Sequence, residues 1–361
     1  MAGSRVEMAL AAMGDEEESQ LDLAGEPLAK DEIAAIASRL SQSPWVEDVD
    51  FGAIGLNDET VHVVADILAG NETIRSISLF ANDLGADAAA PLFAALRRNT
   101  TLTDLSLGWN MLGDDGVLDL VNVQSRDSKL EALNLDHNGI GPRGAAALLG
   151  LAHGSLRRLS LVLNTMIGTD VGCIAEKLAR NTTLETLSLR YCAISDDAAV
   201  FAAALRQNTT LTSLDLDGNT LGDSGASSLA QALTENGSLA DLALDGTGIG
   251  RDGAVALAAM LRCNTAMRSI NLNCNSLGDD GASALADALA VNRTLTRIDL
   301  VRTDIGERGT LALAAAVHAN ATLTKVVLGG NNLDGIRNDT AFSSAVDRGV
   351  IEIIVCVPED A

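Results

Sequence analysis

One phrase recurs along this chain at nearly constant spacing, and this repetition restricts the fold more than any other feature. The stretch LTSLDLDGNTLGDSGASSLAQALTENGS, residues 211–238, is followed at Leu239 by a close variant of itself. Units this short cannot bury their own apolar face, so a period of this size predicts a stack of repeats. Eleven repeats cover about residues 46–335, and each starts with an apolar residue: Val46, Ile74, Leu102, Leu130, Leu156, Leu184, Leu211, Leu239, Met267, Leu295 and Leu323.

Each repeat has two halves with different apolar periods. In the first half Leu214 alternates with Leu216, which is typical of a short strand with one buried face. The second half has apolar residues at i, i+3, i+4 and i+7, which form one face of a helix: Ala226, Leu229, Ala230 and Leu233. We expect Asp223 to cap the start of this helix, and Asn236 to end it in a left-handed conformation.

A strand followed by a helix, always in the same direction, predicts a parallel α/β solenoid. Neighbouring strands lie about 4.8 Å apart, whereas packed helices need roughly 8–10 Å. The stack must therefore curve, with a parallel β-sheet on the concave face and α-helices on the convex face.

An asparagine follows the strand in most repeats, where its amide can bridge the backbone of neighbouring repeats. Ile54, Cys192, Thr247 and Thr303 replace it in the other four repeats, and we expect the Thr and Cys side chains to substitute for it in part. The predicted asparagine ladder consists of Asn82, Asn110, Asn138, Asn164, Asn219, Asn275 and Asn331.

The motif L-x-x-L-x-L-x-x-N, followed by L-G-D-x-G-A-x-x-L-A-x-A-L, resembles the leucine-rich repeat family, and in particular its ribonuclease-inhibitor-like class with full helices. The resemblance implies a horseshoe of about 11 repeats of 28 residues that binds a protein on its concave face. Ribonuclease inhibitor itself is rich in cysteine and alternates two repeat types, whereas this chain has few cysteines and repeats that look uniform.

The sequence around the repeats predicts a cap at each end. Residues 1–25 are acidic and are predicted to be disordered. Residues 26–44 carry one apolar stripe that ends before Pro44, which predicts an N-terminal capping helix: Ile33, Ile36, Ala37 and Leu40. The repeats then occupy residues 45–335, and residues 336–361 are expected to add a last helix and a closing strand.

The overall charge restricts the partner. A net charge of −24 argues against nucleic acid or an anionic membrane and leaves a basic protein surface as a reasonable partner. Five scattered cysteines without a paired spacing indicate reduced thiols. The N-terminus does not resemble a signal peptide, so we expect a cytoplasmic monomer, with the nucleus as the alternative location.

Four sequence features could indicate chemistry, and each has a structural explanation that we favour. GIGRDG at 248–253 matches a dinucleotide-binding pattern, but two of its glycines are repeat positions. Seven N-x-[S/T] sequons fall at one repeat position, after the helix. The pairs Asp114–Asp115 and Asp279–Asp280 suit helix capping better than calcium binding. We therefore expect no cofactor and no metal.

The fourth feature is a Ser–His–Asp set on adjacent strands, formed by Asp136, His137 and Ser160. Only the proximity of these strands supports it. We therefore expect a non-enzymatic protein.

The candidate partner-binding residues are those exposed on the concave face, just before the ladder position and along the strands. Aromatic and apolar residues occupy neighbouring repeats, and acidic and basic residues follow. Two alternatives stay open, since loops could cover the aromatic residues and the charges could serve only solvation. The candidates are Phe80, Trp109, His137, Leu163, Arg190, Tyr191, Asp215, Asp217, Asp245 and Arg302.

Three functions fit this sequence. The first is an interaction scaffold. The second is activation of a Ran-like small GTPase, because activators of Ran share this repeat class, although their acidic segment is C-terminal and here it is N-terminal. The third is an inhibitor or sensor-type module, although sensors join the horseshoe to a nucleotide-binding domain and no GxxxxGK[ST] motif occurs here.

Overall fold

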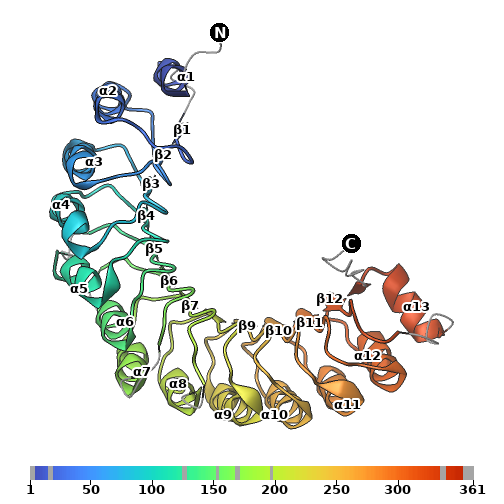
Figure 1. Cartoon of the computed structure of the whole chain (residues 1–361). Helices are drawn as coiled ribbons and strands as arrows, with labels where there is room; N and C mark the ends of the chain where they lie inside the picture. Colours follow the sequence, from blue (N-terminus) through green and yellow to red (C-terminus); the bar gives the residue numbers. More distant parts are fainter. Residues whose placement is uncertain are drawn as a thin grey trace. The chain divides into compact units, whose positions relative to one another are not determined.

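The computed structural model describes residues 5–14, 19–123, 128–151, 154–166, 171–195, 198–333 and 339–352. Along these residues helices alternate with short strands (Figure 1). The chain divides into two compact units, Met1–Thr165 and Met166–Ala361, which we call the first and the second unit.

The first unit contains a parallel sheet whose strands pair in chain order. Its strands are β1 (Gln20–Asp22), β2 (Asp48–Asp50), β3 (Ser76–Ser78), β4 (Asp104–Ser106), β5 (Ala132–Asn134) and β6 (Arg158–Ser160). Its helices are α1 (Arg5–Ala12), α2 (Lys30–Leu40), α3 (Asp58–Gly70), α4 (Ala86–Leu96), α5 (Gly113–Val123) and α6 (Pro142–Leu149).

The second unit repeats this plan, again with parallel pairing in chain order. Its strands are β7 (Thr186–Ser188), β8 (Ser213–Asp215), β9 (Asp241–Ala243), β10 (Ser269–Asn271), β11 (Arg297–Asp299), β12 (Lys325–Val327) and β13 (Ile351–Glu352). Its helices are α7 (Val171–Arg180), α8 (Ala198–Leu205), α9 (Gly222–Glu235), α10 (Arg251–Leu261), α11 (Gly278–Leu289), α12 (Glu307–Ala319) and α13 (Thr340–Asp347).

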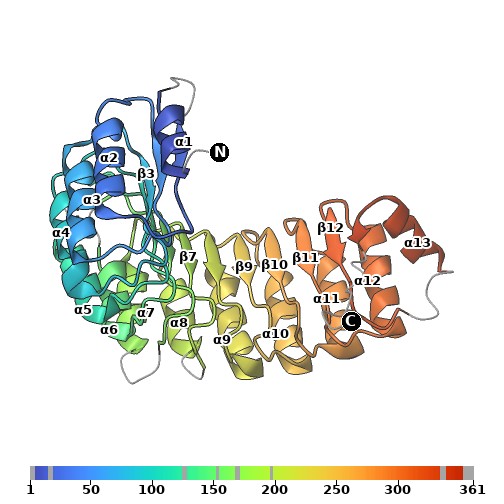
Figure 2. The same cartoon turned by 45° about the horizontal axis from the view of Figure 1, so that its top comes forward.

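Within each unit the strands line one side and the helices the other, as two views show (Figures 1 and 2). The predicted parallel α/β solenoid is therefore confirmed. None of the helices in the described part of the chain is long and apolar enough to cross a membrane.

Aliphatic rows between the strands and the helices form the core. The register aligns Leu214, Leu242, Ile270 and Ile298 on neighbouring strands, and each of these side chains is buried. Fully burying one such side chain contributes about 1.5–3 kcal/mol. The helices complete the core with the predicted stripe, which in α9 includes buried Ala226 and Leu229.

Asparagine side chains join each repeat to the one before it at the end of the strand. Asn219 Nδ2 donates to Leu189 O of the preceding repeat at 2.9 Å and to Leu216 O of its own repeat at 2.8 Å. Its Oδ1 accepts from Cys192 N and Ile194 N. The same Nδ2 bond to the preceding repeat is made by Asn82, Asn110, Asn138, Asn164, Asn275 and Asn331.

Threonine replaces only part of this ladder. Thr247 Oγ1 donates to Leu244 O at 2.8 Å, and Thr303 Oγ1 donates to Leu300 O at the same distance. Both acceptors belong to the threonine's own repeat, because the shorter side chain does not span to the preceding repeat. Ile54 lies fully buried in the apolar core instead.

A second row of asparagines joins the repeats after the helices. Asn236 Nδ2 donates to Leu205 O at 2.6 Å and to Asn208 O at 3.0 Å, and its Oδ1 accepts from Ser238 N and Leu239 N. The expected left-handed helix end is wrong, because Asn236 has φ −74° and ψ 125°. This extended backbone lets the amide reach the preceding repeat. Equivalent donor bonds are made by Asn99, Asn208, Asn264, Asn292 and Asn320.

This second row also explains the repeated sequons. The Nδ2 atom to which a glycan would be attached instead donates to buried carbonyls, for example in Asn208 and Asn292. The asparagine at this position therefore stabilises the stacking of the repeats.

The aspartates at the helix starts cap the neighbouring helix, so the prediction that Asp223 caps its own helix is wrong. Asp223 Oδ1 accepts from Gly250 N at 2.7 Å and from Gly253 N at 2.8 Å, at the start of α10. Since α9 begins at Gly222, Asp223 already lies inside its first turn. Asp114 and Asp279 bond the next repeat in the same way, which supports capping over calcium binding.

The repeats differ in where a left-handed residue follows the strand, so their expected uniformity is wrong. The repeats that supply the aspartate have a left-handed glycine before it: Gly113, Gly222 and Gly278. The repeats that receive it have their left-handed residue earlier, just after the ladder position: Gly139, Gly248 and Asp304.

The N-terminal segment differs from the predicted disorder within residues 5–14 and 19–25. Strand β1 pairs with β2 through Gln20 and Asp48, one repeat length apart, and Leu21 and Leu23 are buried. Arg5 of α1 donates to Ala24 O at 2.8 Å at this edge of the sheet. Two alternating leucines suffice for a strand here because the sheet beside them supplies the pairing.

The caps predicted around the repeats coincide with elements of the structure. The expected N-terminal capping helix corresponds to α2, which buries Ile33, Ile36 and Leu40. Within residues 336–361 lie α13 and β13, whereas residues 353–361 are outside the described residues.

Replacing Asn236 with alanine tests the second asparagine row. Asn236→Ala removes bonds to two carbonyls and two amides that are largely buried, so we expect a loss of about 2–4 kcal/mol in unfolding free energy. Urea unfolding followed by circular dichroism measures it. Asn122→Ala, at an exposed position of α5, is the control and should change stability by less than about 0.5 kcal/mol. Equal effects of the two variants would contradict a structural role for this row.

Candidate functional site

The residue before the ladder position has a left-handed backbone in every repeat. With a side chain, this conformation costs about 1–2 kcal/mol, whereas glycine adopts it readily. Glycine nevertheless occupies only three of these positions, and large side chains occupy several others. Their φ angles lie between 50° and 71°: Ala53, Ala81, Trp109, His137, Leu163, Tyr191, Gly218, Gly246, Cys274, Arg302 and Gly330.

In the first unit, three rings from neighbouring repeats form what we call the aromatic cluster: Phe80, Trp109 and His137. The Trp109 and His137 rings stack with centroids 4.3 Å apart, and the Phe80 and Trp109 centroids are 6.2 Å apart. Gly108 leaves room for this, since a Cβ there would lie 3.2 Å from Phe80 Cδ2. Stacked rings contribute about 0.5–1.5 kcal/mol beyond their burial.

The aromatic cluster stays open to solvent. Phe80 is 40% exposed and Trp109 48% exposed, and Leu163 occupies the equivalent position of a neighbouring repeat at 43%. Ring packing therefore explains why these side chains lie together, but it leaves a large apolar area uncovered.

In the second unit, Tyr191 and charged residues form what we call the acidic cluster: Arg190, Tyr191, Asp215, Asp217 and Asp245. The Tyr191 ring lies against Gly218, where a Cβ would come within 2.0 Å of Tyr191 Cε1. The Arg190 guanidinium lies over the same ring, 5.0 Å from its centroid. The exposed Tyr191 ring can therefore lie here only because residue 218 is a glycine.

Two of the carboxylates in this cluster, Asp215 and Asp217, lie in the repeat of β8, and Asp245 lies in the next repeat. Asp215 accepts from Ser188 Oγ at 3.0 Å and from Asp217 N at 3.0 Å. Asp217 Oδ1 in turn accepts from Asp245 N at 2.6 Å. These bonds hold the Asp215 and Asp217 carboxylates in place on the strand side of the second unit.

Asp217 is a buried carboxylate with an unusual charge balance. Only 8% of its side chain is exposed, and this burial is the main reason why its pKa rises to about 6. The bond from Asp245 N lowers the pKa, the carboxylates of Asp215 and Asp245 raise it, and Arg190 lowers it. The Arg190 pKa is raised, first by its hydrogen bond with Tyr191.

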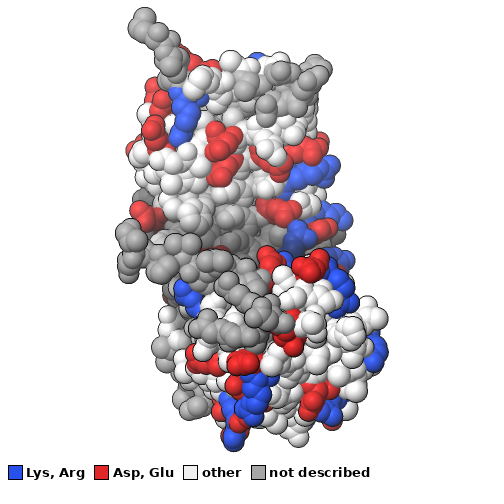
Figure 3. Space-filling view, turned by 90° about the vertical axis from the view of Figure 1, so that its right-hand side faces the viewer, with Lys and Arg blue, Asp and Glu red and all other residues white. Residues whose placement is uncertain are grey.

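Arg302 belongs to neither cluster. It is exposed at the left-handed position of a later repeat, in the second unit. The structure therefore brings together Phe80, Trp109 and His137 in one place and the acidic cluster in another. Figure 3 shows acidic side chains next to basic ones on one face.

The proposed Ser–His–Asp set does not assemble as a triad. Ser160 Oγ donates directly to Asp136 Oδ1 at 2.5 Å, and Val162 N donates to the same oxygen at 2.8 Å. The His137 ring instead stacks on Trp109. Asp136 therefore serves as an acceptor that joins neighbouring repeats.

The backbone amides of the GIGRDG segment are likewise already hydrogen-bonded within the protein. The amides of Gly250 and Gly253, which a phosphate would need, donate to Asp223 of the preceding repeat. Among the described residues, no group of three or more His, Cys, Asp or Glu could hold a metal ion.

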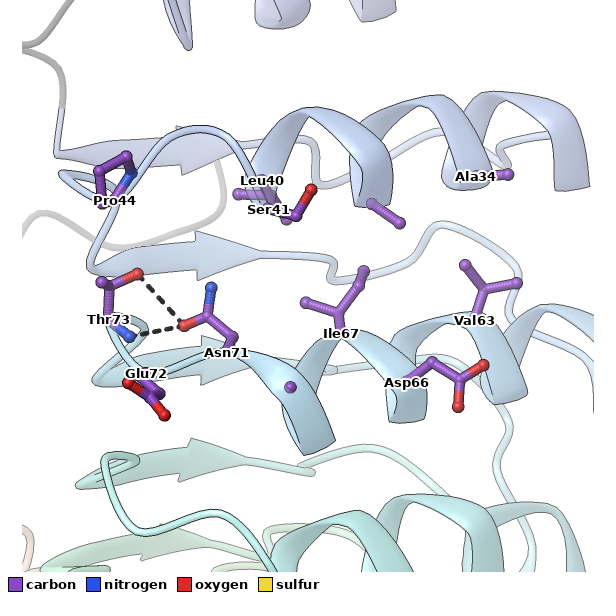
Figure 4. Close-up of a pocket in the computed structure, with 12 residues that line it drawn as sticks. Ala34, Leu40, Ser41, Pro44, Val63, Asp66, Ile67, Asn71, Glu72 and Thr73 are labelled. Atoms are coloured by element: carbon purple, nitrogen blue, oxygen red, sulfur yellow. Dashed lines mark hydrogen bonds between the residues drawn. The ribbon is translucent and has the colours of Figure 1, made fainter.

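A groove lies between α2 and α3 and extends to the segments that lead from these helices into β2 and β3 (Figure 4). It has a volume of about 540 Å³ and is lined by small and apolar side chains such as Ala34, Leu40, Val63 and Ile67. Asp66 and Glu72 are its acidic residues. No cluster of groups suited to catalysis lines it.

Sequence comparisons identify known repeats in this chain. Residues 98–121, 126–149, 180–201 and 207–230 match the family described as Leucine Rich repeat. Residues 227–340 match the TMOD/LMOD Leucine-rich domain. No curated protein matches the sequence.

Solved structures show the same fold at low sequence identity. An internalin (inlF) from Listeria monocytogenes is 17% identical, with 99% of this chain and 96% of that chain covered and a TM-score of 0.52. The leucine-rich repeat-containing protein LegL7 from Legionella pneumophila is also 17% identical, with 83% and 97% covered and a TM-score of 0.50. These likenesses support the fold alone.

Replacing Asp217 with asparagine should stabilise the protein in a pH-dependent way. The folded pKa of about 6 exceeds the unfolded value of about 3.9, so the folded state binds the proton more tightly. The carboxylate therefore lowers stability as pH rises from about 4 to above 6. We expect Asp217→Asn to gain on the order of 2 kcal/mol at pH 7.5, and the gain to shrink toward pH 4.

Thermal and urea unfolding across this pH range measure the effect. Exposed Asp66→Asn in α3 is the control with the same charge change. A gain for Asp217→Asn that is independent of pH, or no larger than that of the control, would show that burial does not disfavour this carboxylate.

Proposed function

Because this chain is a leucine-rich repeat protein, we propose that it is a non-enzymatic scaffold that binds a protein partner with the strand side of its repeats. The contact residues in this proposal are the aromatic cluster with Leu163 in the first unit, and the acidic cluster with Arg302 in the second.

One observation carries the proposal, namely large side chains in left-handed backbone at the strand ends. Trp109 and Tyr191 have φ of 56° and 53° and stay about half exposed. Their positions tolerate glycine, as Gly218, Gly246 and Gly330 show. A side chain that costs backbone energy and buries only part of its surface is better explained by contact with a partner than by folding.

The charges on the strand side would also orient the partner as it approaches. The chain carries a net charge of −24, and the acidic cluster presents three carboxylates on the strand side of the second unit. Such a field attracts a basic surface and orients it during encounter. A basic protein is therefore the partner class that we favour.

Activation of a Ran-like small GTPase and a role as an inhibitor or sensor module stay alternative hypotheses. The rate of GTP hydrolysis by Ran, with and without micromolar amounts of this protein, separates activation from scaffolding. Acceleration would favour the activator hypothesis.

Affinity capture from a cell extract tests the scaffold proposal. We expect Trp109→Ala with Tyr191→Ala to lose at least one partner that the wild type captures, with recovery down by about tenfold or more, because central aromatic contacts contribute most of the binding energy. Quantitative mass spectrometry measures recovery.

The matched control is Val255→Ala with Val291→Ala. These valines are 45% and 55% exposed and belong to the helix side of the repeats. Identical capture by wild type, control and aromatic variant would overturn the proposed contact surface.

A further inference from the structure

Asp217 combines deep burial with an incomplete pairing. The residue is 6% exposed, and Asp245 N bonds its Oδ1 atom. Its Oδ2 atom has an ion-pair partner in Arg190 Nη1, but at 3.8 Å the two are too far apart for a hydrogen bond. A buried carboxylate of this kind is usually paired at close range.

Arg190 contacts Tyr191 but makes no close hydrogen bond with Asp217. Its side chain is 43% exposed, and its guanidinium lies over the exposed Tyr191 ring. Its ion pair with Asp217 lacks the short hydrogen bonds that make charge-assisted pairs strong, so a cation that forms such bonds can replace it. Arg190 therefore lies beside Asp217 without forming a close hydrogen bond with the Asp217 carboxylate.

The surroundings favour a cation over any other group. Asp215 and Asp245 add two further carboxylates beside Asp217, and the face of Tyr191 attracts positive charge as well. Among the described residues, Arg190 is the only cation paired with Asp217. Around Asp217, the strand side of the second unit therefore carries more negative than positive charge.

We propose that the place between the Tyr191 ring and Asp217 receives an arginine or lysine side chain from a basic segment of the protein partner, which displaces Arg190. This inference rests on the proposed scaffold function and names the chemistry that its second unit recognises. A guanidinium suits the place best, because it stacks on a ring and bonds carboxylates with two N–H groups.

Proton binding should oppose this contact. As pH falls through about 6, Asp217 takes up a proton and loses the charge that attracts the partner's cation. Binding should therefore weaken from pH 7.5 to pH 5 more in the wild type than in a variant without this carboxylate.

Fluorescence polarisation with a labelled octa-arginine peptide tests the site on the full chain. We expect Asp217→Asn to weaken binding by at least about tenfold and Tyr191→Ala by about fivefold. The charge-matched Asp66→Asn, on helix α3, should change it by less than about twofold. The ratio between wild type and Asp217→Asn should fall toward one at pH 5.

The Arg190→Ala variant tests whether the peptide displaces Arg190 or is only attracted by the negative charge of the protein. Removing the competing cation should tighten peptide binding by about threefold relative to Arg206→Ala, an exposed position after α8 with the same charge change. Weaker binding by Arg190→Ala than by Arg206→Ala would overturn the proposal, since Arg190 would then itself contribute to binding. Unfolding midpoints establish that each variant is folded.

Equal losses in Asp217→Asn and Asp66→Asn would also overturn the inference, because the peptide would then respond only to net charge. That result leaves the scaffold proposal intact if the aromatic variants still lose their partner in affinity capture. Conversely, capture that does not depend on Trp109 and Tyr191 removes the scaffold surface, whatever the peptide does.

Discussion

Hydrogen bonds from asparagine side chains to the neighbouring repeat are the interaction on which the rest of this structure depends. The chain turns sharply after every strand and after every helix, and the backbone groups at these corners are buried. Leaving one such group unpaired costs about 1–3 kcal/mol. Asn219 at one corner and Asn236 at the other satisfy carbonyls of the preceding repeat as well as local amides. Because these bonds cross between repeats, a repeat completes its hydrogen bonding only when it is stacked.

At the same corners, the residues that join the repeats are distinct from the residues that form the exposed surface. The ladder residue points inward, while the residue just before it is left-handed and its side chain varies, as the change from Trp109 to Gly246 shows. Large side chains at this position are the basis of the proposed binding surface. Asp217 adds a second cost, since its burial disfavours the charge that it carries at neutral pH. Residues at such positions can be substituted without disturbing the stacking of the repeats.

Sequence periodicity was sufficient to predict the fold, because a period of two followed by a helical stripe leaves a parallel solenoid as the simple solution. Predictions that depended on which repeat a side chain bonds were less successful. Asp223 and Asn236 were assigned to their own helix, although both reach a neighbouring repeat. Spacing along the chain does not distinguish these partners, since equivalent atoms recur one repeat away.

The candidate site was predictable in part. Repeat position alone selected Trp109, His137 and Tyr191, but it gave no information on their backbone. The signal was present in the glycines at the same position, Gly218 and Gly246, which indicate a left-handed turn. The burial of Asp217 had no such signal, because it arises from packing among side chains of several repeats.

The most direct test measures folding and binding on one chain that carries Trp109→Gly and Tyr191→Gly. If these side chains are retained for a partner, relief of the left-handed backbone should offset much of the lost ring packing. The thermal midpoint should then stay within about 4 °C of the wild type while partner capture is lost. A midpoint that falls much further, with capture unchanged, would show that the rings serve the fold and contradict their role in binding.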